Sequence, residues 1–239
     1  MSTTTQSPIA EIRKRANISQ RDLATGLGVH YSLIASLEAG LLDIAETDKD
    51  GQVQGVFQAV AEMTGHCALS LIERQEEFTQ STRDGIRDKL VHHIKQTVVE
   101  EWSGSVCEEL DKEAVLAMIR GPMRSWCEEY AKSPVRFFRE QANVSQRQFA
   151  LAAGVSQSLV ARVEAGQLGL YHDPRSGAGK LTEFLAEIFG GHHGTEVWGE
   201  LVEMQERFVT EVKRQAKVKV RSALENLKDS SQGNDHDDC

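Results

Sequence analysis

The chain has 239 residues, with 27 Lys and Arg against 36 Asp and Glu, which gives a formal net charge of −9. Hydrophobic residues make up 40% and aromatic residues 6% of the chain. This composition predicts a globular protein of one or two domains and excludes one that coats nucleic acid through bulk positive charge. A protein that reads DNA through a small local surface stays compatible with it.

The sequence offers no sign of a membrane or a secretory pathway. No stretch reaches the roughly 20 consecutive apolar residues of a membrane span, and residues 1–6 lack the basic and apolar segments of a signal peptide. Four cysteines occur without CxxC spacing, which favours free thiols over disulfides and gives no support to a zinc site: Cys67, Cys107, Cys127 and Cys239. We therefore expect a cytoplasmic protein without a membrane partner.

An internal repeat organises the chain. Residues 7–40 recur without a gap as residues 133–166, and 17 of the 34 aligned positions are identical. Most differences at apolar positions keep them apolar, as in Ile9 and Val135 or Leu37 and Val163, which is typical of two copies of one packed core. Residues 71–78 and 201–208 also match, at 5 of 8 positions. The chain is thus predicted to contain two repeats of about a hundred residues each.

The periodic apolar spacing predicts an all-α fold. In chain order we expect helices near 8–16, 20–27, 30–38, 53–64 and 68–100, two short connecting helices separated at Gly121-Pro122, and then helices near 134–142, 146–153, 156–164, 179–189 and 195–227. A stripe on the long helix after the first repeat should be buried: Ile86, Leu90, Ile94 and Val98.

These elements define the predicted domains. The boundaries are a flexible N-terminus at 1–6, a first domain at 7–66, a long helical extension at 67–102, a helical connector at 103–132, a second domain at 133–193, a second long extension at 194–228 and a disordered acidic tail at 229–239.

Each repeat carries the same residues at the start and the end of a predicted short helix. Ser19 and Ser145 are suitable N-caps for a short helix, and Gly28 and Gly154 end that helix where a positive φ permits a sharp turn. A second helix follows at once. Two helices joined by so tight a turn form a helix-turn-helix, whose second helix can enter a major groove.

The pattern resembles the Cro and repressor family of lambdoid phages, the XRE-like class of DNA-binding domains. In the first repeat the matching residues are Arg13, Gln20, Leu23, Ala24, Gly28, Val29, Ser32, Leu33, Ile34, Glu38, Ala39 and Gly40. The second repeat matches at Arg139, Gln146, Phe149, Ala150, Gly154, Val155, Ser158, Leu159, Val160, Glu164, Ala165 and Gly166. The resemblance implies two Cro/repressor-like domains, each followed by long helices, with double-stranded DNA as the partner.

The resemblance also assigns roles to residues. Base edges would be read by His30, Tyr31, Ser32 and Ser36 in the first repeat and by Ser156, Gln157, Ser158 and Arg162 in the second. Phosphate contacts would come from Gln20, Arg21, Gln146 and Arg147. Arg13 with Glu38, and Arg139 with Glu164, would form structural ion pairs, although a phosphate-binding role for the arginines is an alternative.

Local charge agrees with a DNA partner. Residues 7–40 carry four cations and three anions, and residues 133–166 carry four cations and two anions, so both motifs are positive on a negative background. The acidic loop at 41–51 directly follows the first predicted recognition helix, which counts against full engagement of that copy.

Other motifs have simpler interpretations. The adjacent histidines at 92–93 and 192–193 point about 100° apart on a helix and lack further ligands, so no metal is expected. Residues 176–180 lack the first glycine of a phosphate-binding loop and are predicted to be a loop before a helix. We find no catalytic arrangement and expect neither an enzyme nor a cofactor.

The sequence therefore predicts a sequence-specific transcription regulator, and a repressor in particular, that reads two half-sites. The alternatives are a plasmid or phage maintenance factor that binds a centromere or origin, and an antitoxin-like protein-interaction module. The long helices have two interpretations: they pack within one chain as a pseudo-dimer, or they join two chains in a homodimer.

Overall fold

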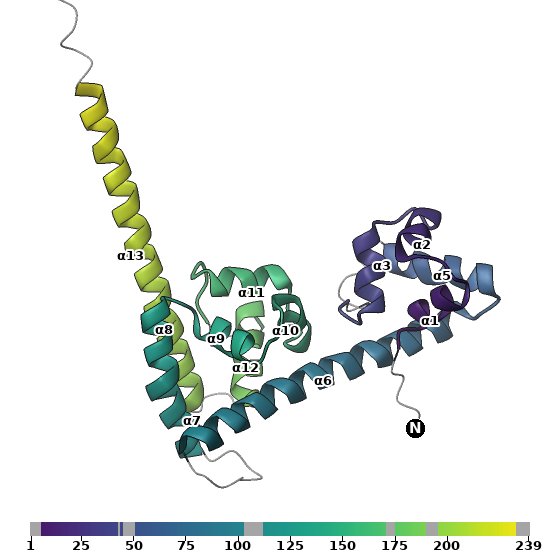
Figure 1. The fold of residues 1–239 in the computed structure, drawn as a ribbon, viewed down its shortest axis with the longest axis horizontal. Helices are drawn as coiled ribbons and strands as arrows, with labels where there is room; N and C mark the ends of the chain where they lie inside the picture. The colour runs from purple at the N-terminus through teal and green to yellow at the C-terminus, as the bar shows by residue number, and fades with distance from the viewer. Residues whose placement is uncertain are drawn as a thin grey trace, which may run out of the picture. The chain divides into compact units, whose positions relative to one another are not determined.

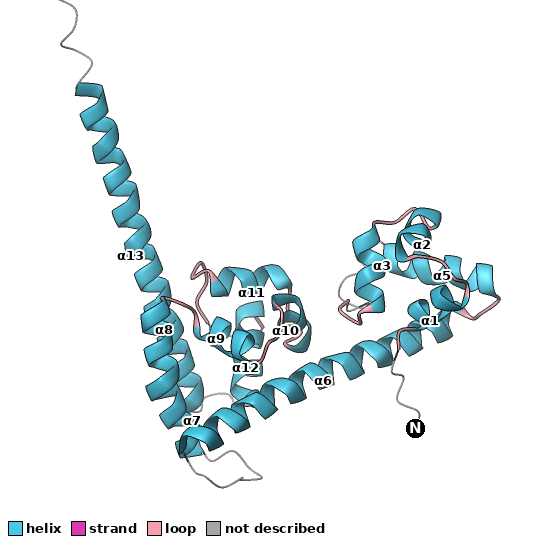
Figure 2. Cartoon of the chain, in the orientation of Figure 1, coloured by secondary structure: helices cyan, strands magenta, loops and turns pink. Residues whose placement is uncertain are grey.

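The computed structural model describes residues 6–42, 44, 51–102, 112–170, 175–189 and 196–232. Within these ranges the chain forms helices and connecting loops and contains no strand, as the sequence predicts (Figure 2). None of the described helices is both long enough and apolar enough to cross a bilayer.

In the described part of the first repeat, the helices that agree closely with the sequence prediction are α1 (Pro8–Arg15), α2 (Gln20–Gly26), α3 (Tyr31–Glu38), α5 (Gln52–Thr64) and α6 (Ala68–Trp102) (Figure 1). Helix α1 begins at a proline, whose fixed φ suits the first helical turn. Helix α2 is capped by Ser19, whose hydroxyl oxygen accepts a hydrogen bond from the backbone N–H of Asp22 at 3.1 Å. Helix α6 passes through Gly85 without interruption.

One apolar core joins these helices, and it includes the start of the long helix. Ile34, Leu37 and Phe57 are fully buried at its centre, and Leu71 on α6 belongs to the same cluster with 1% of its surface exposed. The predicted boundary between residues 66 and 67 therefore cuts through a continuous core, because the first turns of α6 cover the apolar side of α1, α3 and α5.

The connector differs from the prediction of two helices separated at Gly121-Pro122. Helix α7 (Lys112–Met118), a π-helical turn η1 (Ile119–Met123) and helix α8 (Arg124–Tyr130) follow one another without a loop. Pro122 lies inside the π-helical turn. Proline has no N–H and its ring clashes with the preceding turn of an α-helix, and one wider turn accommodates both constraints without ending the helix.

The second repeat contains α9 (Pro134–Gln141), α10 (Gln146–Ala152), α11 (Gln157–Glu164), α12 (Gly177–Ile188) and α13 (Glu196–Gln232). Aromatic rings pack edge to face beside α9, with ring centroids 4.5 Å apart for Phe138 and Phe189 and 4.9 Å apart for Phe137 and Trp126. Residues 177–180, predicted as a loop, form the first turn of α12, because the Ser176 hydroxyl caps the backbone N–H of Gly179 at 2.9 Å.

The contacts divide the structure into two compact units, Met1–His92 with Val144–Gln157, and His93–Asn143 with Ser158–Cys239. The predicted stripe of α6 is buried at Ile86, Leu90 and Ile94, while the side chain of Val98 lies outside the described residues. Helix α13 continues to Gln232, four residues into the predicted tail. Most of the predicted N-terminal segment, most of the acidic loop after α3 and the last seven residues lie outside the described ranges.

Candidate nucleic-acid interface

The turn between the two helices of each motif has the same geometry in both repeats. Gly28 has φ +66° and Gly154 has φ +62°, a region that an L side chain rarely adopts. The following valine N–H donates back into the preceding helix, from Val29 to Ala24 O at 3.0 Å and from Val155 to Ala150 O at 2.9 Å. These bonds satisfy the last carbonyl groups of α2 and α10 and reverse the chain within a few residues.

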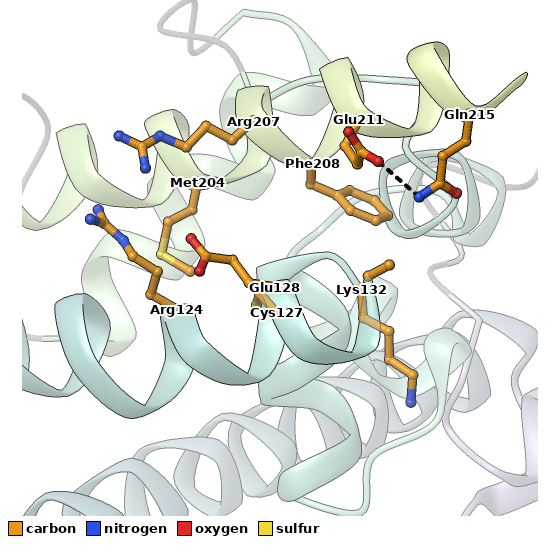
Figure 3. A pocket seen from close by; sticks show the side chains of 10 residues that line it. Arg124, Cys127, Glu128, Lys132, Met204, Arg207, Phe208, Glu211 and Gln215 are labelled. Carbon is orange, nitrogen blue, oxygen red and sulfur yellow. Dashed lines mark hydrogen bonds between the residues drawn. The ribbon is translucent and has the colours of Figure 1, made fainter. Parts of the chain in front are cut away.

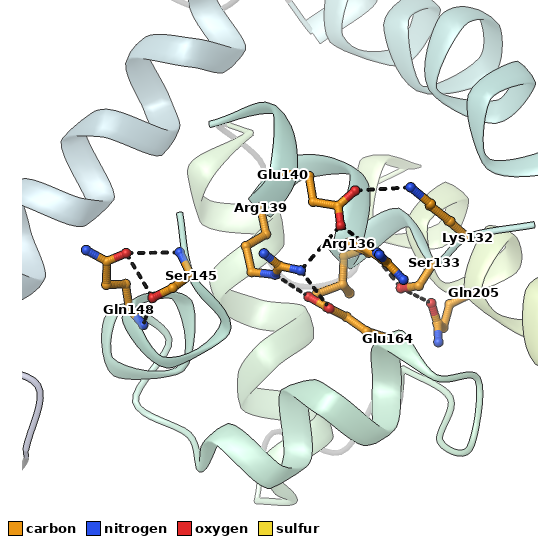
Figure 4. A network of polar contacts seen from close by, with 10 residues as sticks. Lys132, Ser133, Arg136, Arg139, Glu140, Ser145, Gln148, Glu164 and Gln205 are labelled. Atoms are coloured by element: carbon orange, nitrogen blue, oxygen red, sulfur yellow. Dashed lines mark hydrogen bonds and ion pairs between the residues drawn. The ribbon is translucent and has the colours of Figure 1, made fainter. Parts of the chain in front are cut away.

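An ion pair fixes the end of each second helix. In the first repeat Arg13 Nε and Nη2 donate to the two carboxylate oxygens of Glu38 at 2.6 and 2.9 Å, and in the second Arg139 donates to Glu164 at 2.7 and 3.0 Å (Figure 4). The glutamate side chains are only 6% and 4% exposed. The carboxylates hold the pKa of Arg13 and Arg139 above the ordinary arginine value. Two-point, nearly buried pairing is the geometry of a structural link between the first helix and the recognition helix.

A buried glutamine provides a second link that the sequence analysis did not identify. Gln75 on α6 accepts a hydrogen bond from the Ser7 hydroxyl at 2.7 Å and donates to Leu37 O at 2.7 Å. Its equivalent on α13, Gln205, accepts from Ser133 at 3.0 Å and donates to Val163 O at 2.8 Å. Both glutamines are fully buried. The long helices therefore hold the start of the first helix and the end of the recognition helix.

The identity of these glutamines was visible in the sequence, because both lie at the same position of the repeated segments 71–78 and 201–208. The signal was a glutamine that is identical in both repeats and lies, at helical spacing, on the same face as the leucine four residues before it and the phenylalanine three residues after it. It was missed because an isolated glutamine on a helix is normally solvated.

The N-terminal turn of α3 presents three of the four predicted base-reading residues of the first repeat. His30, Tyr31 and Ser32 are exposed, and His30 also caps the helix, with its Nδ1 accepting from the Ser32 N–H at 3.3 Å. The Tyr31 hydroxyl donates to Gln20 Oε1 at 3.0 Å, and the guanidinium of Arg21 lies 5.8 Å from the centre of the Tyr31 ring. This surface is ordered by contacts among its own side chains.

Ser36 differs from the other three in its surroundings. It is 2% exposed, and its hydroxyl donates to the carbonyl oxygen of Ser32 within α3. A short side chain that bonds to the backbone one turn earlier does not extend beyond the helix surface. Its hydroxyl also accepts a hydrogen bond from Arg147 Nη2, so Ser36 is a buried, bonded residue in this structure, and base reading by Ser36 stays a prediction.

The second repeat exposes all four of its candidates. Ser156, Gln157, Ser158 and Arg162 are exposed at the start of α11 and one turn later. Arg162 occupies the position equivalent to the buried Ser36, so the two recognition helices differ most at this site. Their differing side chains offer different hydrogen-bonding groups to a base edge.

The predicted phosphate-contacting residues lie around the start of the supporting helices. Arg21 is exposed, whereas Gln20, Gln146 and Arg147 are half-buried. The Gln20 amide donates to Glu38 Oε2 at 2.7 Å, which places it over the ion pair of the first repeat. In this position its side chain supports the recognition helix, and its backbone N–H lies in the first turn of α2, where helices offer donors to anions.

A separate pocket lies between α8 and α13. It has a volume of about 310 Å³, and its apolar wall is formed by Cys127, Met204 and Phe208 (Figure 3). Burial raises the pKa of the Cys127 thiol to about 12. The two arginines that line it are already paired, Arg124 with Glu200 at 3.0 Å and Arg207 with Glu203. The positive charge of both arginines is therefore already compensated within the chain, and the lining also includes the carboxylate of Glu128.

The histidines and cysteines in the described part of the chain do not form a metal-binding group. His92 and His93 are the described pair, and the histidines at 192–193 lie outside the described residues. Among the described residues no three His, Cys, Asp or Glu side chains come close enough together to hold a metal ion.

Comparison with known protein families gives two matches to one profile, that of the helix-turn-helix family. They cover residues 9–46 and 135–168, one in each repeat. No curated protein and no solved structure shows significant similarity to the chain. The two matches confirm the XRE-like character of both repeats and the tandem arrangement.

Proposed function

Since both repeats are helix-turn-helix domains, the architecture of DNA-binding regulators, we propose that the chain is a sequence-specific regulator of transcription that reads two half-sites in double-stranded DNA. The observation that carries the proposal is the exposure of hydrogen-bonding side chains at the start of both recognition helices, on a framework held by ion pairs and buried glutamines.

The chemistry of the second repeat is the more specific. Gln157 has the donor and acceptor pair that matches adenine, and Arg162 has the fork that matches the O6 and N7 atoms of guanine. In the first repeat His30, Tyr31 and Ser32 offer a different set of groups. Because the two surfaces differ, the two half-sites of the target should differ as well.

The regulatory output we propose is repression. Two recognition helices in successive major grooves cover a site of about two helical turns and would exclude polymerase from an overlapping promoter. Linking two weak DNA-binding domains in one chain raises the effective concentration for the second contact to the millimolar range, so one chain suffices for tight binding. A homodimer through the long helices would double the number of half-sites. The proposed DNA target also places the protein at the nucleoid.

The test is selection of binding sites from a random duplex library by the purified protein at about 0.15 M salt. The expected result is one motif with two dissimilar halves. An array of identical short sites would favour a plasmid or phage maintenance factor, and the absence of any enriched motif would favour a protein-interaction module.

Substitution of the second recognition helix makes the assignment specific. Gln157→Ala and Arg162→Ala should each weaken binding to the selected site by about 1–3 kcal/mol and relax sequence preference in one half only. The control is Gln167→Ala, an exposed residue beyond the end of α11. Equal losses on selected and scrambled duplexes would contradict base readout by these residues.

A further inference from the structure

The C-terminal third of α13 carries a dense cluster of positive charge. Residues 213–221 contain five cations and no anion, in a chain whose net charge is −9. The equivalent stretch of α6, residues 83–91, contains three cations and two aspartates. The two repeats therefore differ in charge at the same place on the same helix.

The helix geometry aligns these cations. Lys213, Lys217 and Arg221 follow one another at intervals of four residues and thus lie on one face, about 6 Å apart along the axis. Arg214 lies beside this face, and Lys219 lies on the other side of the helix. Every residue from 213 to 223 is exposed, so no described part of the chain covers this segment.

Most of these cations have no ion-pair partner among the side chains that the structure describes. Arg214 pairs with Glu211 at 2.6 Å, as Arg207 pairs with Glu203 and Arg120 with Glu196 and Glu200 elsewhere in this unit. Among the side chains that the structure describes, none forms an ion pair with Lys213, Lys217 or Arg221. A row of like charges along a helix destabilises it slightly, so it suggests an anionic partner.

This row begins where the recognition helix ends. Gly166, at the end of α11, lies so close to α13 that an added Cβ would be 2.8 Å from Val212 Cγ2 and 3.1 Å from Phe208 Cε1. Val212 immediately precedes Lys213. The start of the cationic row is therefore fixed relative to the end of α11 through direct packing within one unit.

We propose that Lys213, Lys217 and Arg221 on α13 form a second DNA contact, which binds the phosphate backbone beside the half-site read by α11. This inference rests on the proposed DNA-binding function and deepens it. The row spans about 12 Å, and double-stranded DNA carries one negative charge per about 1.7 Å of its axis, so a duplex supplies enough phosphates to match all three cations. Contact would add affinity without sequence preference.

A second copy of the chain is the less suitable partner for this face. Val218 and Val220 are 55% and 60% exposed, which offers some apolar surface. However, pairing two identical cationic helices through this segment would bring the like charges of both into proximity, which costs free energy.

The experiment measures DNA affinity for the wild-type full-length protein and for one triple variant, Lys213→Gln with Lys217→Gln and Arg221→Gln. The duplex extends about 15 base pairs beyond the selected site on both sides. A matched control, Arg87→Gln, Lys89→Gln, Lys180→Gln, has the same net charge of −12 but leaves the row intact. Circular dichroism verifies folding of both variants, and light scattering gives their mass.

Each phosphate contact contributes about 0.9 to the slope of log K against log salt concentration. The row variant should therefore show a slope shallower by about 2.7 than wild type, with an unchanged affinity ratio between selected and scrambled sites, and the control should keep the wild-type slope. If the row variant has the same slope as the control, the second DNA contact is overturned. It is also overturned if the row variant has half the mass of the wild-type protein and an unchanged slope, which would indicate a dimer surface. If the wild-type protein binds selected and scrambled duplexes equally well, the proposed function itself is refuted. This result is distinct from the outcomes for the row variant.

Discussion

Replacing Arg139 by alanine tests whether the ion pair of the second repeat is structural. Arg139 makes two hydrogen bonds to Glu164, whose side chain is only 4% exposed. The substitution removes the guanidinium and leaves a carboxylate that is almost fully withdrawn from water. Loss of one partner of a buried pair costs about 3–5 kcal/mol, because the remaining charge is desolvated without compensation.

A double substitution separates the cost of the stranded charge from the value of the pair. Arg139→Met with Glu164→Leu removes both charges and keeps most of the apolar volume, so its cost should be small, or stability should even rise. Arg139→Ala should therefore be the less stable variant by several kcal/mol. Arg13→Ala in the first repeat should repeat the behaviour of Arg139→Ala, since its pair has the same geometry.

The assay is urea unfolding followed by circular dichroism, with stability obtained by linear extrapolation. The result that would refute the reasoning is a loss below about 1 kcal/mol for Arg139→Ala, or a double variant as unstable as the single one. A stable Arg139→Ala protein that binds all duplexes more weakly would instead support the alternative role of Arg139 in phosphate binding.

Three further outcomes follow from the packing of the long helices. Gly166→Ala should destabilise the second repeat by about 1–3 kcal/mol or more in urea unfolding, because φ is +68° and Val212 leaves no room for Cβ; wild-type stability would contradict this packing. Gln205→Leu should cost about 1–3 kcal/mol for each carbonyl group left unsatisfied, and a stabilised variant would show that the buried link is dispensable. At pH 8, Cys127, with its pKa raised to about 12, should resist alkylation in the folded protein while exposed Cys67 reacts, as peptide mapping would show; equal rates would indicate that the α8–α13 packing opens readily.

The local elements of the motif were predictable because their signals are local. The serine caps of α2 and α10 and the glycines of the tight turns each act within a few residues, so the sequence places them correctly. Each of these signals occurs twice at the same spacing, once in each repeat.

The features that depend on tertiary contacts were not predictable in the same way. The burial of Ser36 against the exposure of Arg162 depends on the surroundings of each recognition helix. The role of Gln75 depends on a carbonyl group supplied by Leu37, 38 positions away. Pro122 suggested a break, but packing keeps the chain helical through a π-helical turn. Composition suggested a tail from residue 229, although α13 continues to Gln232.

The central claim is that both repeats of one chain bind DNA together. The most direct test measures the affinity of the full-length protein, at one stated salt concentration, for duplexes that carry both selected half-sites or either half-site alone. Simultaneous engagement predicts that the complete site binds about 10²–10⁴ times more tightly than the better half-site, through the effective concentration of the linked domain. Equal affinity for the complete site and for one half-site would show that only one repeat binds DNA, and it would contradict simultaneous binding by both repeats.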